Sequence, residues 1–176
     1  MTPEHPPNTP DSARLLRRVR LWTLLFVIGL VLSGVTAIPV AEEVRWMVVA
    51  SGAEALARGA DAPGWAQWLV KVDHGLQTTQ TSFPFLFYGT DWLAFGHLMI
   101  ALVFVWAWKD PVRNQWLFTY GIVACVLVIP WAFFFGALRG IPWWWRLIDC
   151  SFGVFGLIPL WLCRRWVRQV AALKQR

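Results

Sequence analysis

A few ionisable side chains stand within or beside long apolar runs of this chain, where an ionised group is costly and often has a function. Three of them, His97, Asp91 and Asp149, could support acid–base chemistry. Histidine gains and loses a proton near neutral pH, and a neighbouring carboxylate can orient its ring. We therefore take His97 as the candidate catalytic acid/base, with Asp91 or Asp149 as its orienting partner.

A second set of side chains could bind an anionic group where the chain meets the membrane surface. Two arginines stand on either side of three consecutive tryptophans, and an acidic pair follows the first apolar run. Arginine pairs with phosphates and carboxylates, and tryptophan collects at membrane interfaces. The candidates for ligand or partner binding are Arg139, Arg146, Trp143, Trp144, Trp145, Glu42 and Glu43.

Other reaction types lack their sequence signals. The chain has no His-Glu-x-x-His pair, no Gly-x-Ser-x-Gly string, no glycine-rich phosphate loop and no Cys-x-x-Cys pair. The other two histidines, His5 and His74, fall in a tail and a loop, so His97 has no second histidine at its depth for haem ligation. No metal site is predicted, and any cofactor stays unknown.

Four apolar runs must position these residues, at about 21–40, 92–108, 116–138 and 147–163. Each run is close to the roughly 20 residues that cross a bilayer as a helix. The hydrophobic share of 57% exceeds the about 45–50% that is usual in soluble domains, so the excess must face lipid. The sequence therefore predicts an all-α fold, a bundle of four transmembrane helices.

Basic residues set the orientation of this bundle. Arginines crowd residues 14–20, two cations lie in the turn at 109–114, and residues 164–176 carry five cations without an acid. Cytoplasmic segments are rich in Lys and Arg, so both termini are predicted to be cytoplasmic, in a bacterial inner membrane. This pattern explains the net charge of +6 without nucleic acid. We expect a disordered tail at 1–13, a membrane domain at 14–165 and a basic tail at 166–176.

The wide segment 41–90 belongs on the outer side of the membrane. Its acids outnumber its basic residues by five to three. Amphipathic helices are predicted at about 42–60 and 65–79, separated by Ala62-Pro63-Gly64. They would form an extracytoplasmic cap of one or two helices between the first and second spans, with their apolar faces on the membrane surface. A packing cap and a dedicated binding domain both remain open.

With this topology, ionisable side chains converge near the outer membrane face. They are Asp91, His97, Arg139, Arg146 and Asp149, with Glu42 or Glu43. Asp149 follows Arg146 by three residues, a spacing that lets the two side chains pair on one helix. Gly153 and Gly156 continue the stripe of Asp149, and small residues let helices approach closely. The cluster is either a polar pocket or a set of interhelical salt bridges, and both interpretations stay open.

Three strings resemble those of an uncharacterised bacterial family of four-helix integral membrane proteins. They are Tyr88-Gly-Thr-Asp-Trp-Leu-Ala-Phe-Gly-His97, Asp110-Pro-Val-Arg-Asn114 and Arg139-Gly-Ile-Pro-Trp-Trp-Trp-Arg-Leu-Ile-Asp-Cys-Ser-Phe-Gly153. The resemblance covers most of residues 21–165 and implies a fold and a membrane location, with no activity attached. The four-span isomerase and sterol-binding group typified by the sigma-2 receptor is similar in size and helix count only.

Two functions follow as hypotheses. The first is a non-enzymatic membrane subunit, or a lipid- or partner-binding protein, that uses the outer arginines and tryptophans. The second is a small membrane enzyme or redox subunit acting on a quinone or lipid, with His97 as acid/base. The expected partners are the lipid bilayer, other membrane subunits or a second copy in a homodimer. The sequence does not decide whether a reaction is catalysed.

Overall fold

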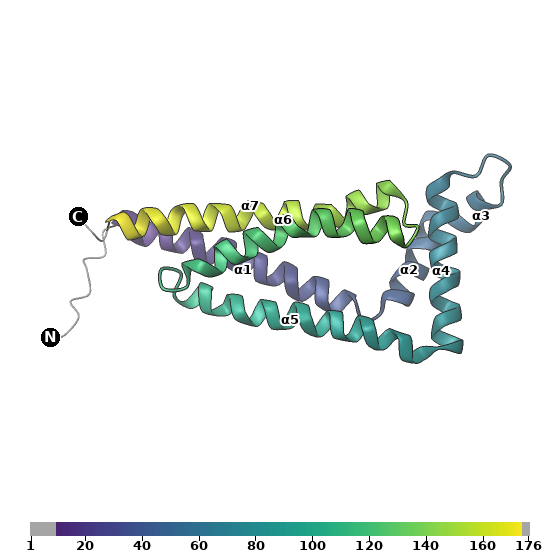
Figure 1. Ribbon diagram of the computed structural model, residues 1–176, viewed down its shortest axis with the longest axis horizontal. Helices are drawn as coiled ribbons and strands as arrows, with labels where there is room; N and C mark the ends of the chain where they lie inside the picture. Colours follow the sequence, from purple (N-terminus) through teal and green to yellow (C-terminus); the bar gives the residue numbers. More distant parts are fainter. Residues whose placement is uncertain (1–9, 174–176) are drawn as a thin grey trace. The chain divides into compact units, whose positions relative to one another are not determined.

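The computed structural model describes residues 10–173, and these form helices and no strand (Figure 1). The α-helices are α1 Pro10–Thr36, α2 Val40–Ser51, α3 Ala53–Ala57, α4 Gly64–Ser82, α5 Tyr88–Lys109, α6 Gln115–Leu138 and α7 Trp143–Leu173, and a short 3₁₀-helix, η1, covers Pro84–Phe87. Within this range four helices are long and apolar enough to cross a membrane: α1, α5 together with η1, α6 and α7. The prediction of an all-α chain with four helices able to span a membrane is confirmed.

The helices extend beyond the predicted spans at both ends of the chain. α1 begins at Pro10, so residues 10–13 are helical rather than part of a disordered tail, whereas residues 1–9 lie outside the described range. Proline suits a first helical position because the N–H that it lacks would have no partner inside the helix. α7 continues to Leu173, so residues 166–173 of the predicted basic tail extend the last helix.

The turn after α1 comes earlier than the predicted span end at residue 40. α1 ends at Thr36, and Pro39 is the N-cap of α2. The Ala37 and Ile38 amides donate to carbonyls only three residues back, at 3.2 Å and 3.3 Å. Such tightened bonds are common in a final helical turn. Because proline cannot continue the α1 hydrogen-bond ladder and disfavours helical backbone in the residue before it, the helix ends here.

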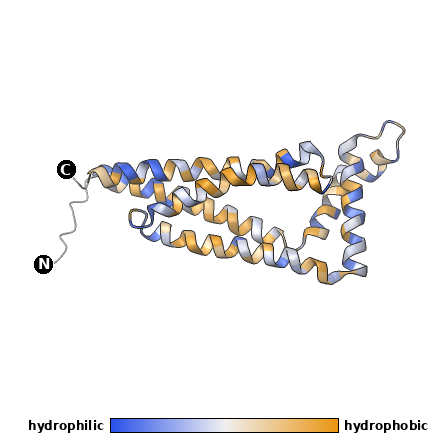
Figure 2. Ribbon diagram, viewed as in Figure 1, coloured by the Kyte–Doolittle hydropathy of each residue, from blue (hydrophilic) through white to orange (hydrophobic). Residues whose placement is uncertain are grey.

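The described chain divides into two compact units: residues 10–29 with 101–173 form the first unit, and residues 30–100 form the second. In the first unit α6 and α7 lie side by side (Figure 1). An added Cβ at Gly153 would be 2.6 Å from the Cys125 carbonyl oxygen, and one at Gly121 would be 2.7 Å from a Leu160 methyl group. The predicted small residues of α7 therefore do face a neighbouring helix, as close packing in lipid requires. Figure 2 shows that α6 is mostly hydrophobic.

α1 joins the first unit through buried contacts with α7 and α5. Val19, Thr23 and Cys163 are fully buried. The Thr23 hydroxyl donates to the Val19 carbonyl at 2.8 Å, and the Cys163 thiol donates to the same carbonyl at 3.5 Å. One turn further along α1, Phe26 packs edge to face against Phe104, with ring centroids 4.8 Å apart. These contacts fix α1 against two neighbours without any charged group.

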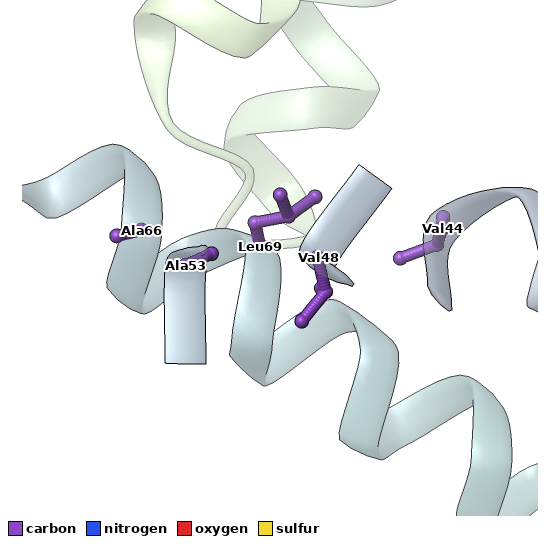
Figure 3. Close-up of a cluster of buried hydrophobic side chains, with 5 residues drawn as sticks. All are labelled: Val44, Val48, Ala53, Ala66 and Leu69. Carbon is purple, nitrogen blue, oxygen red and sulfur yellow. The ribbon is translucent and has the colours of Figure 1, made fainter. Parts of the chain in front are cut away.

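The second unit contains a small helical core formed by α2, α3 and α4. Gly52 has a φ of +65°, a left-handed conformation that ends α2 and divides the predicted helix at 42–60 into α2 and α3. Figure 3 shows the hydrophobic cluster that joins the three helices. It contains Val44, Val48, Ala53, Ala66 and Leu69. Figure 1 shows α4 running across the direction of the first turns of α5, with η1 between them.

Candidate functional site

The predicted site residues are distributed over both units of the chain. The first unit holds Arg139, Arg146, Asp149, Trp143, Trp144 and Trp145, and the second holds Glu42, Glu43, Asp91 and His97. Each unit thus carries its own set of candidate groups.

The turn between α6 and α7 contains a left-handed backbone conformation, which glycine adopts most readily. Arg139 is the C-cap of α6, and Gly140 follows it with a φ of +69°. The Ile141 amide donates to the Gly136 carbonyl at 2.8 Å, and the Gly140 amide donates to the Ala137 carbonyl at 3.1 Å. These two bonds form the Schellman arrangement, which satisfies the last carbonyls of a helix and here fixes the path of the chain into α7.

Arg146 is held against the end of α6. Its Nε donates to the Ile141 carbonyl at 2.8 Å, and its Nη1 donates to the Phe133 carbonyl at 3.4 Å. The aliphatic part of the side chain lies over Gly136, where an added Cβ would be 2.6 Å from the Arg146 Cδ. Gly136 therefore provides the space for this side chain, and two backbone carbonyls fix the position of its positive charge.

The ion pair expected between Arg146 and Asp149 does not form. In the described part of the first unit no carboxylate lies within ion-pair distance of Arg146, and Asp149 is half-buried. Their spacing permits a pair, but Arg146 turns toward the Ile141 carbonyl instead. The Arg146 guanidinium consequently has no acidic partner in the described part of that unit.

Tryptophans and a second arginine surround this turn. The tryptophans form the first turn of α7 rather than part of the preceding loop. Trp143 is 65% exposed, and the half-buried Trp144 and Trp145 pack edge to face with ring centroids 5.7 Å apart. Arg139 is exposed. Two arginines beside three tryptophans are a suitable composition for holding an anionic group at a membrane interface.

One ring nitrogen of His97 forms a hydrogen bond within its own helix. Its Nδ1 lies 2.8 Å from the Leu93 carbonyl oxygen, which can only accept, so Nδ1 carries a proton and donates it. In the neutral ring Nε2 then carries the lone pair. The Cβ of His97 lies beside α1, because an added Cβ at Gly34 would be 3.0 Å from it. Asp91 is exposed, and no hydrogen bond joins it to His97 in the second unit.

The acidic pair after the first span belongs to α2, where Glu42 contacts the end of α4. The Gln80 side-chain amide donates to Glu42 at 3.0 Å. This hydrogen bond, followed by one from the backbone N–H of Glu42, lowers the pKa of Glu42 below its ordinary value of 4.5. A few residues away, the Gln77 amide donates to the Ala41 carbonyl at 3.4 Å. Glu42 therefore helps to join α2 to α4.

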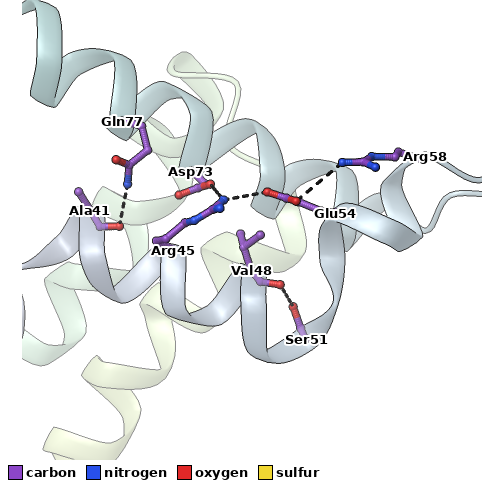
Figure 4. Close-up of polar contacts among 8 residues, drawn as sticks. All are labelled: Ala41, Arg45, Val48, Ser51, Glu54, Arg58, Asp73 and Gln77. Carbon is purple, nitrogen blue, oxygen red and sulfur yellow. Dashed lines mark hydrogen bonds and ion pairs between the residues drawn. The ribbon is translucent and has the colours of Figure 1, made fainter.

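A polar network that the sequence pattern did not reveal connects α2, α3 and α4 (Figure 4). The Arg45 Nη1 lies 2.8 Å from a Glu54 oxygen and 3.1 Å from an Asp73 oxygen, and Arg58 lies 3.8 Å from Glu54. The hydrogen bonds from Arg45 to Glu54 and Asp73 raise the pKa of Arg45 above its ordinary value. Asp73 is only 5% exposed, and its Oδ1 has no hydrogen-bond partner. The network holds α2, α3 and α4 to one another.

Helical spacing on α4 could have indicated the unusual position of Asp73. Ala66, Leu69 and Asp73 recur at three- and four-residue intervals, and all three are buried. An acid on the apolar face of an amphipathic helix needs a partner, because an unpaired buried charge is costly. The spacing does not say whether Arg45 or Arg58 provides that partner, since both lie in the segment before α4, whose packing the sequence leaves open.

The described residues thus contain a cationic turn, a histidine with one defined tautomer and an ion-pair network in which Asp73 is the buried member. Within the same range no group of three or more His, Cys, Asp or Glu side chains could hold a metal ion. In comparisons with known proteins, no family model, no curated protein and no solved structure matches this chain.

Proposed function

We propose that this chain is a non-enzymatic, multi-pass protein of a bacterial inner membrane that binds an anionic group at the α6–α7 turn. In this proposal both termini are cytoplasmic, α2, α3 and α4 form the cap on the outer side, and the chain belongs to the bacterial four-helix family that it resembles. The anionic group is a lipid headgroup or a carboxylate of a partner subunit, which share the chemistry that arginine recognises.

The fixed position of Arg146 carries the proposal. A guanidinium has more N–H donors than the two that Arg146 directs to the Ile141 and Phe133 carbonyls. The remaining donors are held at the end of the α6–α7 pair, and no carboxylate in the described part of the first unit neutralises them. A cation that is already ordered loses little conformational entropy when it binds an anion.

The surroundings of Arg146 favour a ligand at the membrane interface. Arg139 supplies a second, exposed cation on the same turn, and the highly exposed Trp143 supplies an amphipathic ring that is suited to the headgroup region. Neither residue is needed to close the turn, because backbone bonds from Gly140 and Ile141 already do so. Both side chains are therefore available for a ligand.

Copurification with the double variant Arg139→Gln/Arg146→Gln tests the proposal. Removing both charges should release an anionic phospholipid or a copurifying protein, and native mass spectrometry distinguishes these two sources. The control Arg58→Gln/Lys71→Gln removes two cations from the second unit and should change neither. A thermal melt shows whether each variant is folded. If the folded double variant binds as many anionic lipids and the same proteins as the wild type, the proposal is wrong.

A second candidate function is a small enzyme or redox subunit that acts on a quinone or lipid. The observation that favours it is the bond from His97 Nδ1 to the Leu93 carbonyl, which directs the lone pair of the neutral ring to Nε2. A half-buried base with one fixed tautomer is suited to taking a proton from a substrate.

The visible spectrum and the bound small molecules of purified wild-type and His97→Ala protein test this candidate. A Soret band or a retained quinone that disappears in His97→Ala would support a role for His97 in binding or chemistry. Identical spectra and identical bound molecules in the two proteins would contradict it. Replacing exposed His74 with alanine is the matched control, since that residue lies on α4.

A further inference from the structure

Figure 2 shows hydrophilic residues at the end of the first unit where α1 begins and α7 ends, and in the sequence many of these residues are cations. They come from the start of α1, the end of α5, the α5–α6 turn and the end of α7. Together they are termed the cationic end: Arg14, Arg17, Arg18, Arg20, Lys109, Arg113, Arg164, Arg165 and Arg168. The same segments contain two acids within the described range, Asp11 and Asp110.

Contacts inside the first unit bring these segments together. The Cys163 thiol donates to the Val19 carbonyl at 3.5 Å, which joins α7 to α1. The Arg20 Nη2 donates to the Lys109 carbonyl at 3.5 Å, which joins α1 to the end of α5. Arg20 directly follows Val19, and Arg164 directly follows Cys163. Arginines from two helices therefore lie beside the same buried contact.

The positive charge of the cationic end is not neutralised by acids of its own unit. The Asp110 carboxylate accepts a hydrogen bond from the Arg113 backbone N–H at 3.1 Å, so it caps the turn. The ion pairs formed by the described residues all lie in the second unit. Membrane topology requires only that cations stand near the ends of the spans. It does not require that cations from four segments lie close together without acidic partners.

Exposed tryptophans lie directly beside these cations. The Lys109 Nζ lies 4.9 Å from the Trp106 ring centroid, and the Arg165 guanidinium carbon lies 5.7 Å from the Trp161 centroid. The two tryptophans are 53% and 50% exposed. Cations over half-exposed tryptophans at the ends of apolar helices match the headgroup region of a bilayer, where phosphate and acyl chain meet. This composition favours a lipid over a nucleic acid or an acidic soluble protein.

We propose that the cationic end binds the phosphate of an anionic phospholipid, with Arg20 and Arg164 as the main phosphate ligands. The planar guanidinium can donate two parallel hydrogen bonds to one phosphate, and two such groups on different helices would join α1 and α7 through the headgroup. This site is independent of the proposed function, since it uses neither Arg139 nor Arg146.

The test uses the full-length protein exposed to equal amounts of phosphatidylglycerol and phosphatidylethanolamine, with retained lipid measured by native mass spectrometry. To isolate this site, all variants are made in the Arg139→Gln/Arg146→Gln background. The protein should retain phosphatidylglycerol preferentially, and adding Arg20→Gln/Arg164→Gln should lower that retention roughly tenfold. The control Arg58→Gln/Lys71→Gln should leave it unchanged.

A further double variant, Arg20→Lys/Arg164→Lys, separates the effect of losing the two charges from effects on protein folding and on helix orientation. It keeps both positive charges but lacks the planar guanidinium, so it should recover part of the phosphatidylglycerol. The proposal is overturned if the background protein shows no preference for phosphatidylglycerol, if the Gln pair keeps the preference, or if the control pair loses it as well. It is also overturned if the Lys pair is as defective as the Gln pair, or if an acidic protein occupies the cationic end in place of lipid.

Discussion

The Cα of Gly153 faces the backbone of Cys125 so closely that an added Cβ would lie 2.6 Å from the Cys125 carbonyl oxygen. That oxygen belongs to the α6 backbone and cannot move aside as a flexible side chain could. The distance between α6 and α7 therefore depends on the absence of a side chain at position 153.

Gly153→Ala should force α6 and α7 apart. Overpacking of this kind costs about 1–3 kcal/mol, of which the better helix propensity of alanine offsets up to about 1 kcal/mol. A lower melting temperature by circular dichroism in detergent is the expected result. Gly29→Ala on α1 is the control, because no heavy atom lies within 4 Å of its added Cβ. A melting temperature equal to that of the control would show that the helices are not packed in this way.

Gly136→Ala should displace Arg146 without unfolding the protein. The added Cβ would lie 2.6 Å from Cδ and 2.8 Å from Cγ of Arg146, and a long side chain can move away. The cost is then the loss of the bond to the Ile141 carbonyl, about 1 kcal/mol or a little more. Binding of an anionic group at the α6–α7 turn should fall strongly, whereas the melting temperature should change little. Unchanged binding would show that the position of Arg146 is not important for the ligand.

The sequence predicted the main helices because hydropathy over about twenty residues is a strong signal. It missed features that depend on a single backbone angle or a single rotamer. Gly52 was one small residue in an amphipathic pattern, yet its left-handed φ divides that helix into α2 and α3. For Arg146, helical spacing allowed a bond to Asp149, whereas the space over Gly136 and the Ile141 carbonyl determined the observed rotamer. Such choices arise from packing between helices, which periodicity does not encode.

Asp73→Asn should loosen α2 from α4. The Asp73 carboxylate is buried and lies 3.1 Å from the Arg45 Nη1, so the neutral variant leaves Arg45 with one acid and places an unsatisfied amide in the core. Hydrogen exchange of the α2 amides should become faster. Glu54→Gln also removes one acid from Arg45, but at a half-exposed position, and should have the smaller effect. Equal exchange rates in the two variants would contradict the importance of burial at Asp73.

The hydrogen bond between Gln80 and Glu42 predicts that the stability of the second unit depends on pH. Because the folded pKa of Glu42 is below its ordinary value of 4.5, the bond stabilises the pairing of α2 with α4 above that pH. The stabilisation should be lost as the pH falls from 4.5 through the lower folded pKa. Titration of the Glu42 carboxyl carbon by NMR measures the folded value directly.

Gln80→Ala removes the main cause of the lowered pKa, so the Glu42 titration should move up toward 4.5 in this variant. Gln77→Ala is the matched control, because Gln77 donates to the Ala41 carbonyl, which does not titrate. If the Glu42 pKa moves equally in both variants, the shift comes from general loosening of α4. If it moves only in Gln80→Ala, the side-chain hydrogen bond joins the start of α2 to the end of α4 in the folded protein.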